Sequence, residues 1–230
     1  MIARANIYHG GYNISADSSE WELVPSAAIH DVTTVKLTSV ARVGGNITGS
    51  ISGKGYWDSD TDTELRGELG ESQPFTACIP DNTYGNDAWL AVAKNSNYSL
   101  GASAGDIIPF TYSAQTTGPF VKGKTLVYDT HTVAGTDTGN AVEVTQTTGD
   151  VMVANFHVTA KVGMAANAAI YSSATEGGEY VEHAVFDALM AIGSEQITWT
   201  TDVDHDWWKV QFSQAGATVN TTYLVSLGVC

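Results

Sequence analysis

The chain of 230 residues carries 25 acidic and 10 basic side chains, which gives a formal net charge of −15. This charge repels a phosphate backbone and argues against nucleic-acid binding through a basic face, and no apolar run approaches the roughly 18 residues that a membrane-spanning segment needs. With 43% hydrophobic residues the chain has enough apolar material to fold, either as one large β domain or as two domains of about 100 residues each.

Most of the sequence consists of short segments rich in Val, Ile, Thr, Tyr and Trp, bounded by Gly, Asn, Asp or Ser, a pattern typical of strands between turns. The clearest is the last, where Tyr223, Val225 and Leu227 share one face of a period-two ladder. The number of such segments predicts an all-β fold of the sandwich or barrel class. In chain order we expect strands at residues 32–37, 46–56, 75–79, 88–98, 107–112, 121–128, 141–147, 151–162, 197–200, 207–212 and 219–229.

Two segments have helical features. Between Asp58 and Gly70, capping and acidic residues precede Leu65 and Leu69, which are four positions apart, and this order predicts one short helix. From Tyr180 to Ile192 the apolar residues suit a period of 3.6, although part of the segment also suits a strand, so both interpretations stay open.

Residues 129–140 form a polar, glycine-punctuated stretch between two predicted strands. We therefore expect an N-terminal β domain over residues 1–130, a linker over residues 131–140 and a C-terminal β-sandwich domain over residues 141–230.

Two acidic triplets have the first ligand spacing of a calcium-binding loop. After Asp58, Asp60 and Asp62 the required glycine is Thr63, and after Asp202, Asp204 and Asp206 it is Trp207. The first triplet is better explained as a helix cap, and the second as a polar turn before a strand.

The sequence presents no other pattern that indicates catalysis or a cofactor. Its six histidines lack zinc-ligand spacing, no serine lies on a nucleophile elbow and no phosphate-binding glycine loop occurs. His205 lies between Asp204 and Asp206, but the sequence offers no nucleophile from which it could accept a proton. We expect a protein that is not an enzyme and that has no metal or cofactor, with a hydrolase that uses the abundant carboxylates as a remote alternative.

Trp207 and Trp208 are the candidate contact residues. If their segment is a strand, the two rings point to opposite faces, so that one lies in the core and the other can meet a partner. Flat aromatic faces also stack on sugar rings, which gives an alternative function in carbohydrate binding.

The first residues lack the pattern of a secretory signal, so we expect synthesis and folding in a cytosol. The two cysteines, Cys78 and Cys230, are then expected to be free thiols.

The order of several motifs resembles the major tail protein, or tail tube protein, of long-tailed bacteriophages. In the first half they are residues 11–16 (Gly-Tyr-Asn-Ile-Ser-Ala), 31–34 (Asp-Val-Thr-Thr), 55–58 (Gly-Tyr-Trp-Asp), 65–70, 98, 105–106 (Gly-Asp) and 123–126 (Gly-Lys-Thr-Leu). In the second half, residues 170–173 (Ile-Tyr-Ser-Ser), 177–180 (Gly-Gly-Glu-Tyr), 207–210 (Trp-Trp-Lys-Val) and 223–229 are similar to the β-sandwich appended to such proteins.

The resemblance implies a tail-tube-like β-sandwich or barrel followed by a decoration domain. It also implies self-assembly into rings, usually hexamers, which stack helically into a tube in the virion tail after synthesis in the host cytoplasm. The implied partners are a tape-measure protein and the tail tip or terminator proteins, and DNA passes through an anionic lumen without specific binding. The alternative is a virion decoration protein or a carbohydrate-binding adhesion module.

Overall fold

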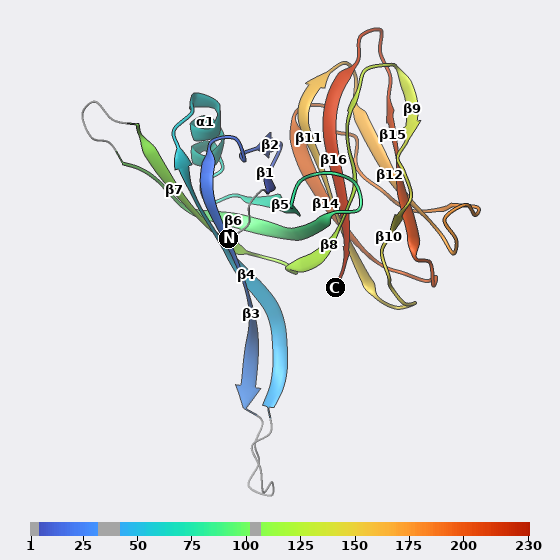
Figure 1. Ribbon diagram of the computed structural model, residues 1–230, viewed down its shortest axis with the longest axis horizontal. Helices are drawn as coiled ribbons and strands as arrows, with labels where there is room; N and C mark the ends of the chain where they lie inside the picture. Colours follow the sequence, from blue (N-terminus) through green and yellow to red (C-terminus); the bar gives the residue numbers. More distant parts are fainter. Residues whose placement is uncertain (1–4, 32–41, 102–106) are drawn as a thin grey trace, which may run out of the picture. The chain divides into compact units, whose positions relative to one another are not determined.

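The computed structural model describes residues 5–31, 42–101 and 107–230, which form an all-β protein with one short helix (Figure 1), and this confirms the predicted fold class. The strand expected at residues 32–37 lies outside the described residues. In chain order the elements are β1 (Asn6–His9), β2 (Tyr12–Asn13), β3 (Ser18–Asp31), β4 (Arg42–Tyr56), α1 (Ser59–Gly67), β5 (Ser72–Ile79), β6 (Asp87–Leu100), β7 (Pro109–Thr116), β8 (Val121–His131), β9 (Gly135–Thr138), β10 (Val142–Glu143), β11 (Val151–Val162), β12 (Ala166–Ser173), β13 (Val181–Val185), β14 (Gly193–Thr200), β15 (Trp207–Gln214) and β16 (Asn220–Val229).

The chain forms two compact units. The first contains Met1–Asp17, Gln73–Val92 and Val121–Cys230, and the second contains Ser18–Ser72 and Ala93–Phe120. Within the first unit, β8 pairs along most of its length with β16. Residues 131–140, expected as a linker between domains at 1–130 and 141–230, contribute β9, which pairs with β15.

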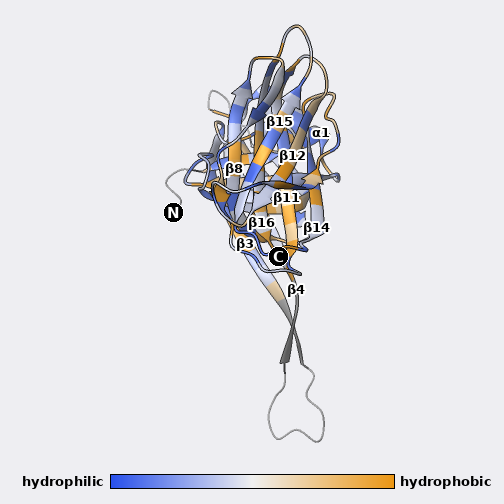
Figure 2. Ribbon diagram, turned by 90° about the vertical axis from the view of Figure 1, so that its right-hand side faces the viewer, coloured by the Kyte–Doolittle hydropathy of each residue, from blue (hydrophilic) through white to orange (hydrophobic). Residues whose placement is uncertain are grey.

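The first unit is a sandwich of antiparallel strands. One sheet has the order β14-β11-β16-β8-β6-β5-β1-β2, and the other has the order β10-β15-β12-β13, with β9 also paired to β15. Figure 2 shows hydrophobic segments along β11 and β12 of this unit. In β12 and β15 buried residues alternate with less buried ones, as expected for strands that cover a core with one face only.

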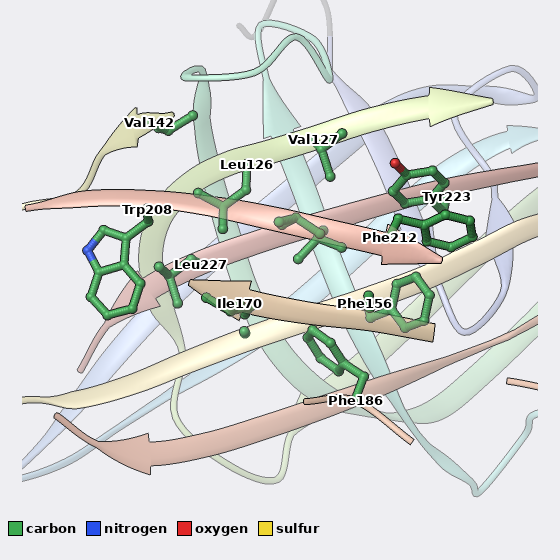
Figure 3. Packing of buried hydrophobic residues seen from close by; sticks show 14 of the residues in the cluster. Leu126, Val127, Val142, Phe156, Ile170, Phe186, Trp208, Phe212, Tyr223 and Leu227 are labelled. Atoms are coloured by element: carbon green, nitrogen blue, oxygen red, sulfur yellow. The ribbon is translucent and has the colours of Figure 1, made fainter. Parts of the chain in front are cut away.

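The core between the two sheets is rich in aromatic side chains (Figure 3). The rings of Phe212 and Tyr223 stack with their centroids 3.9 Å apart, and Phe156 packs against Phe186 at 5.2 Å. Aromatic pairs at such distances add stabilisation beyond the area that they bury. The prediction that Tyr223, Val225 and Leu227 share a face is confirmed, because all three belong to this core.

The opposite face of β16 is also covered. Leu224 is fully buried in a second cluster with Tyr8, Cys78, Ala88 and Leu90, which come from β1, β5 and β6. Cys78 is a free thiol in this cluster, whereas the free thiol of Cys230 is exposed. The β16 strand therefore has a buried side chain on nearly every residue from Tyr223 to Gly228.

The second unit contains α1 and the antiparallel strands β3, β4, β7 and the end of β6. The predicted helix is confirmed: the Asp58 side chain accepts hydrogen bonds from the backbone N–H groups of Asp60 and Thr61. Leu65 is buried, and its carbonyl oxygen accepts a hydrogen bond of 2.6 Å from the Asn95 side chain. Asp58 thus caps the helix, which is the role that the sequence favoured over calcium binding for Asp58, Asp60 and Asp62.

Two segments are less regular than the sequence indicates. In the ambiguous segment from Tyr180 to Ile192, residues 181–185 form the edge strand β13, and the segment contains no helix. Of the strand expected at 141–147, only the two residues of β10 join a sheet. Gln146 lies outside the strand, and its side-chain amide donates to the carbonyl oxygens of Val203 and His205, each at 2.9 Å.

A pair of glycine substitutions tests how closely β8 and β16 approach. A Cβ atom at Gly123 would overlap the backbone of Leu227 and Gly228, whereas a Cβ atom at Gly67 at the end of α1 has nothing within 4 Å. We expect Gly123→Ala to lower the free energy of unfolding by about 2 kcal/mol or more. The matched change Gly67→Ala should raise it by about 0.5–1 kcal/mol. Urea denaturation measures both, and equal effects would contradict the tight pairing.

Candidate functional site

The two candidate tryptophans of β15 have different environments. Trp208 is fully buried, and its indole N–H donates to the carbonyl oxygen of His205 at 3.1 Å, while its ring lies 6.2 Å from that of Trp199. Trp207 is only half-buried. Of the two expected contact residues, Trp208 is therefore unavailable to a partner because its ring is part of the core, and Trp207 alone keeps a surface open to solvent.

A polar cluster that the sequence did not reveal lies at Ser172. Its Oγ is 2.7 Å from Nε2 of His183 and 2.8 Å from Nδ1 of His205, and Nδ1 of His183 is 3.9 Å from the carboxylate of Asp202. Burial lowers the pKa of His183, and His205 adds to this shift, whereas Asp202 opposes it. The three elements that supply these side chains are β12, β13 and the turn before β15.

The distances in this cluster are those of a serine with a histidine base. A nucleophile must also reach its substrate, and Ser172 is fully buried in the sandwich. The hydroxyl instead joins the edge strand β13 to the turn at His205. No sequence motif indicates this cluster, because its four side chains come from three separate segments and only the pairing of β12 with β13 and β15 brings these segments together.

The second acidic triplet, Asp202, Asp204 and Asp206, lies in the polar turn before β15, as expected. Among the residues that the structure describes, no group of three or more His, Cys, Asp or Glu side chains could hold a metal ion. Within the same residues, no helix has the length and apolar character needed to cross a membrane.

A second polar cluster is buried under β11, on the face away from the aromatic core. Nδ1 of His157 is 2.7 Å from the carbonyl oxygen of Gly10, and its Nε2 is 2.9 Å from Oγ1 of Thr76. The Asn155 amide donates to the carbonyl oxygen of Phe75 at 2.8 Å. Burial lowers the pKa of His157 from its ordinary value of 6.5 to about 4. These hydrogen bonds satisfy the buried polar groups and join β11 to β5 and to the turn after β1.

The second unit offers a different feature, a long β3–β4 hairpin (Figure 1). The two strands pair from Ser18 to Asp31, but β4 has a second partner, β7, only along residues 50–56. The remainder is a two-stranded ribbon, and within the described residues β3 has no strand on its outer side. We call residues 23–27 and 47–50 the ribbon segment, which runs from the end of the β4–β7 pairing at Ser50 into the start of the two-stranded ribbon.

The ribbon segment is uncharged, and most of its residues are exposed, while Leu23 and Ser50 are half-buried and Gly49 is buried. Its side chains are Leu, Val, Pro, Ser and Ala on β3 and Ile, Thr, Gly and Ser on β4. Val24 is 43% exposed and Ile47 is 54% exposed. Pro25 cannot donate a backbone hydrogen bond, which suits a strand at the edge of a sheet.

Comparison with known proteins gives only distant similarities. No protein-family model matches the chain, and no curated protein matches it. Among solved structures, 46% of the chain is similar to 85% of a chain from the virion of a native gene transfer agent particle, with 23% identity and a TM-score of 0.39. A chain from the tail of an empty gene transfer agent particle with C6 symmetry is 21% identical over 45% of this chain and 80% of that one, with a TM-score of 0.38.

The Dit protein of phage SPP1, described as a hub of the adsorption apparatus, is similar over 98% of this chain and 99% of its own, with 10% identity and a TM-score of 0.36. These three structures are tail or virion components of phages and phage-like particles. TM-scores below 0.5 do not establish a shared fold, so any function must be argued from the residues of this chain.

The buried histidine makes stability depend on pH. Because the unfolded chain binds a proton at His157 more readily than the folded chain, the free energy of unfolding should fall as the pH decreases from about 6.5 to about 4, by up to roughly 3 kcal/mol. His183, whose pKa is also lowered, adds to this slope. In denaturant titrations at several pH values, His157→Gln should show a shallower loss than the unmodified protein; parallel curves would contradict this assignment.

Proposed function

We propose that the protein is a structural subunit of a virion tail, which self-assembles into stacked rings that form the tail tube of a long-tailed phage. The observation that carries the proposal is the uncharged and largely solvent-exposed ribbon segment of the β3–β4 hairpin. The motif order of the sequence supports the same family. In this proposal the rings are hexameric and residues 141–230 form the outer decoration domain.

An isolated two-stranded ribbon is at best marginally stable in water, because it has no third strand and no covered hydrophobic face. The ribbon segment leaves Val24 and Ile47 uncovered, and its edge strand is free to pair with further backbone. A neighbouring copy would cover both. Small side chains without charge allow close approach without the cost of burying an unpaired ion.

Such a contact joins the ribbon of one copy to a different surface of the next, and a contact of this heterologous kind closes into a ring when its rotation permits. The charge of −15 suits the lumen of a tube, since an anionic wall does not retain DNA. The proposed partners are further copies of this chain, a tape-measure protein and tail tip or terminator proteins. The proposed route is synthesis in the host cytoplasm and incorporation into the virion tail, with no enzymatic role.

Charged substitutions in the ribbon segment test the proposal. We expect the unmodified protein to form rings or tubes at high concentration or with nucleating tail components, as seen by negative-stain electron microscopy. The double variant Val24→Lys with Ile47→Lys should form none, because each buried ammonium group would lack a partner. Sedimentation of the variant should show a folded monomer.

Val133→Lys is the matched control, since Val133 is 72% exposed, lies in the first unit and is outside the ribbon segment. This variant should assemble as the unmodified protein does. An unmodified protein that stays monomeric with a nucleating tip complex would overturn the proposed function. Rings formed by the double variant would show that the ribbon segment is not the contact.

A further inference from the structure

The first unit contains a cleft of about 370 Å³ that none of the functions above uses. It is bordered by the end of β8, by β9 with the residues that follow it, and by the loop between β5 and β6. This volume lies at the lower end of the range for small-molecule sites. Its lining combines aromatic rings, carboxylates and side-chain amides.

The two carboxylates of the cleft come from different sheets. Asp129 pairs in register with Tyr223 on β16, and Asp137 pairs with Phe212 on β15. Partners in an antiparallel ladder point to the same face, so both carboxylates project toward the space above the stacked Phe212 and Tyr223 rings. Consistent with this placement, burial raises the pKa of Tyr223, and Asp129 and Asp137 raise it further.

A β-bulge contributes to this arrangement. The register between β8 and β16 shifts at Leu126, so that Leu126 and Val127 both pack into the core. The next residue, Tyr128, then lies on the face of β8 opposite to Asp129, where the residue is 40% exposed and its ring centroid is 6.3 Å from that of Tyr8. Tyr84, in the loop before β6, is 53% exposed. Both tyrosines border the cleft, and each is partly open to solvent.

Amide groups complete the lining. The Asn82 side chain donates to the Tyr8 hydroxyl at 2.7 Å, which fixes its amide, and Asn140 is exposed after β9. The outer edge of β8 is also open here: Thr125 is bonded to Gly85 and Asn86, but beyond it the described residues provide no strand partner on that side. The cleft thus offers hydrogen-bond donors and acceptors in addition to its carboxylates.

We propose that this cleft binds a neutral saccharide of pyranose rings. An exposed tyrosine ring can stack on the apolar face of a sugar, while a carboxylate accepts hydrogen bonds from its hydroxyl groups and an amide both donates and accepts. An anionic ligand is disfavoured by Asp129 and Asp137. A simple cation would use the carboxylates but not the donor groups of Asn82 and Asn140. This site is separate from Trp207, and the proposal does not depend on the tail-tube function.

Ligand-observed NMR with maltose, cellobiose, lactose and the disaccharide of N-acetylglucosamine tests the proposal. At about 10 mM we expect saturation transfer to at least one of these sugars, with a dissociation constant in the millimolar range. Tyr84→Ala and Asp137→Asn should each weaken this binding about tenfold or abolish it. Both side chains are exposed, so the fold should survive, and circular dichroism verifies that it does.

Two matched variants serve as controls. Tyr56→Ala removes a tyrosine with the same 53% exposure from the second unit, and Asp204→Asn removes one exposed carboxylate outside the cleft. Both should bind as the unmodified protein does, as should Trp207→Ala.

Absence of saturation transfer to all four sugars would overturn the proposal, as would sugar binding that Tyr84→Ala and Asp137→Asn leave unchanged. Binding of spermidine alone, lost in Asp137→Asn, would show a cation site instead.

Discussion

The fold of the first unit depends on the pairing of β16 with β11 on one side and β8 on the other, and on the covering of both faces of these strands. One face meets the aromatic core around Phe212 and Tyr223. The opposite face is apolar at Leu224 but polar at Asn155 and His157, and each of these two side chains has a hydrogen-bond partner in β5 or in the Gly10 turn. The buried polar groups thereby fix which strands lie against β11, since a shifted arrangement would leave them unsatisfied.

Local sequence patterns were sufficient to predict those elements whose signal lies within a single strand or a single helix turn. The strand at 151–162 and the helix capped by Asp58 were both predicted, because their signals are a long apolar run and a capping side chain. The β3 strand was missed, because Pro25 and the charged Glu20 and Glu22 do not resemble a buried strand. It forms nevertheless, because its long partner β4 supplies the ladder that its own sequence does not indicate.

The sites were harder to predict than the strands, because they depend on register between distant segments. Trp207 and Trp208 were recognised as residues on opposite faces, but only the packing shows that Trp208 is the buried one. The cluster at Ser172 and the cleft beside Tyr84 leave no trace in the spacing of their residues. In the cleft, Asp129 and Asp137 face a common space only because β15 and β16 stack Phe212 on Tyr223.

The central position of β16 also affects how the protein can be made. It follows every other strand that the structure describes, while its partner β8 ends at His131. Until Val229 has left the ribosome, the nascent sheet has a gap at its middle, and the edges of β8 and β11 have no neighbour there. Pairing between such distant segments is slow to form, and an open strand edge is prone to aggregation in the meantime. Completion of the first unit therefore waits until the whole of β16 has been synthesised.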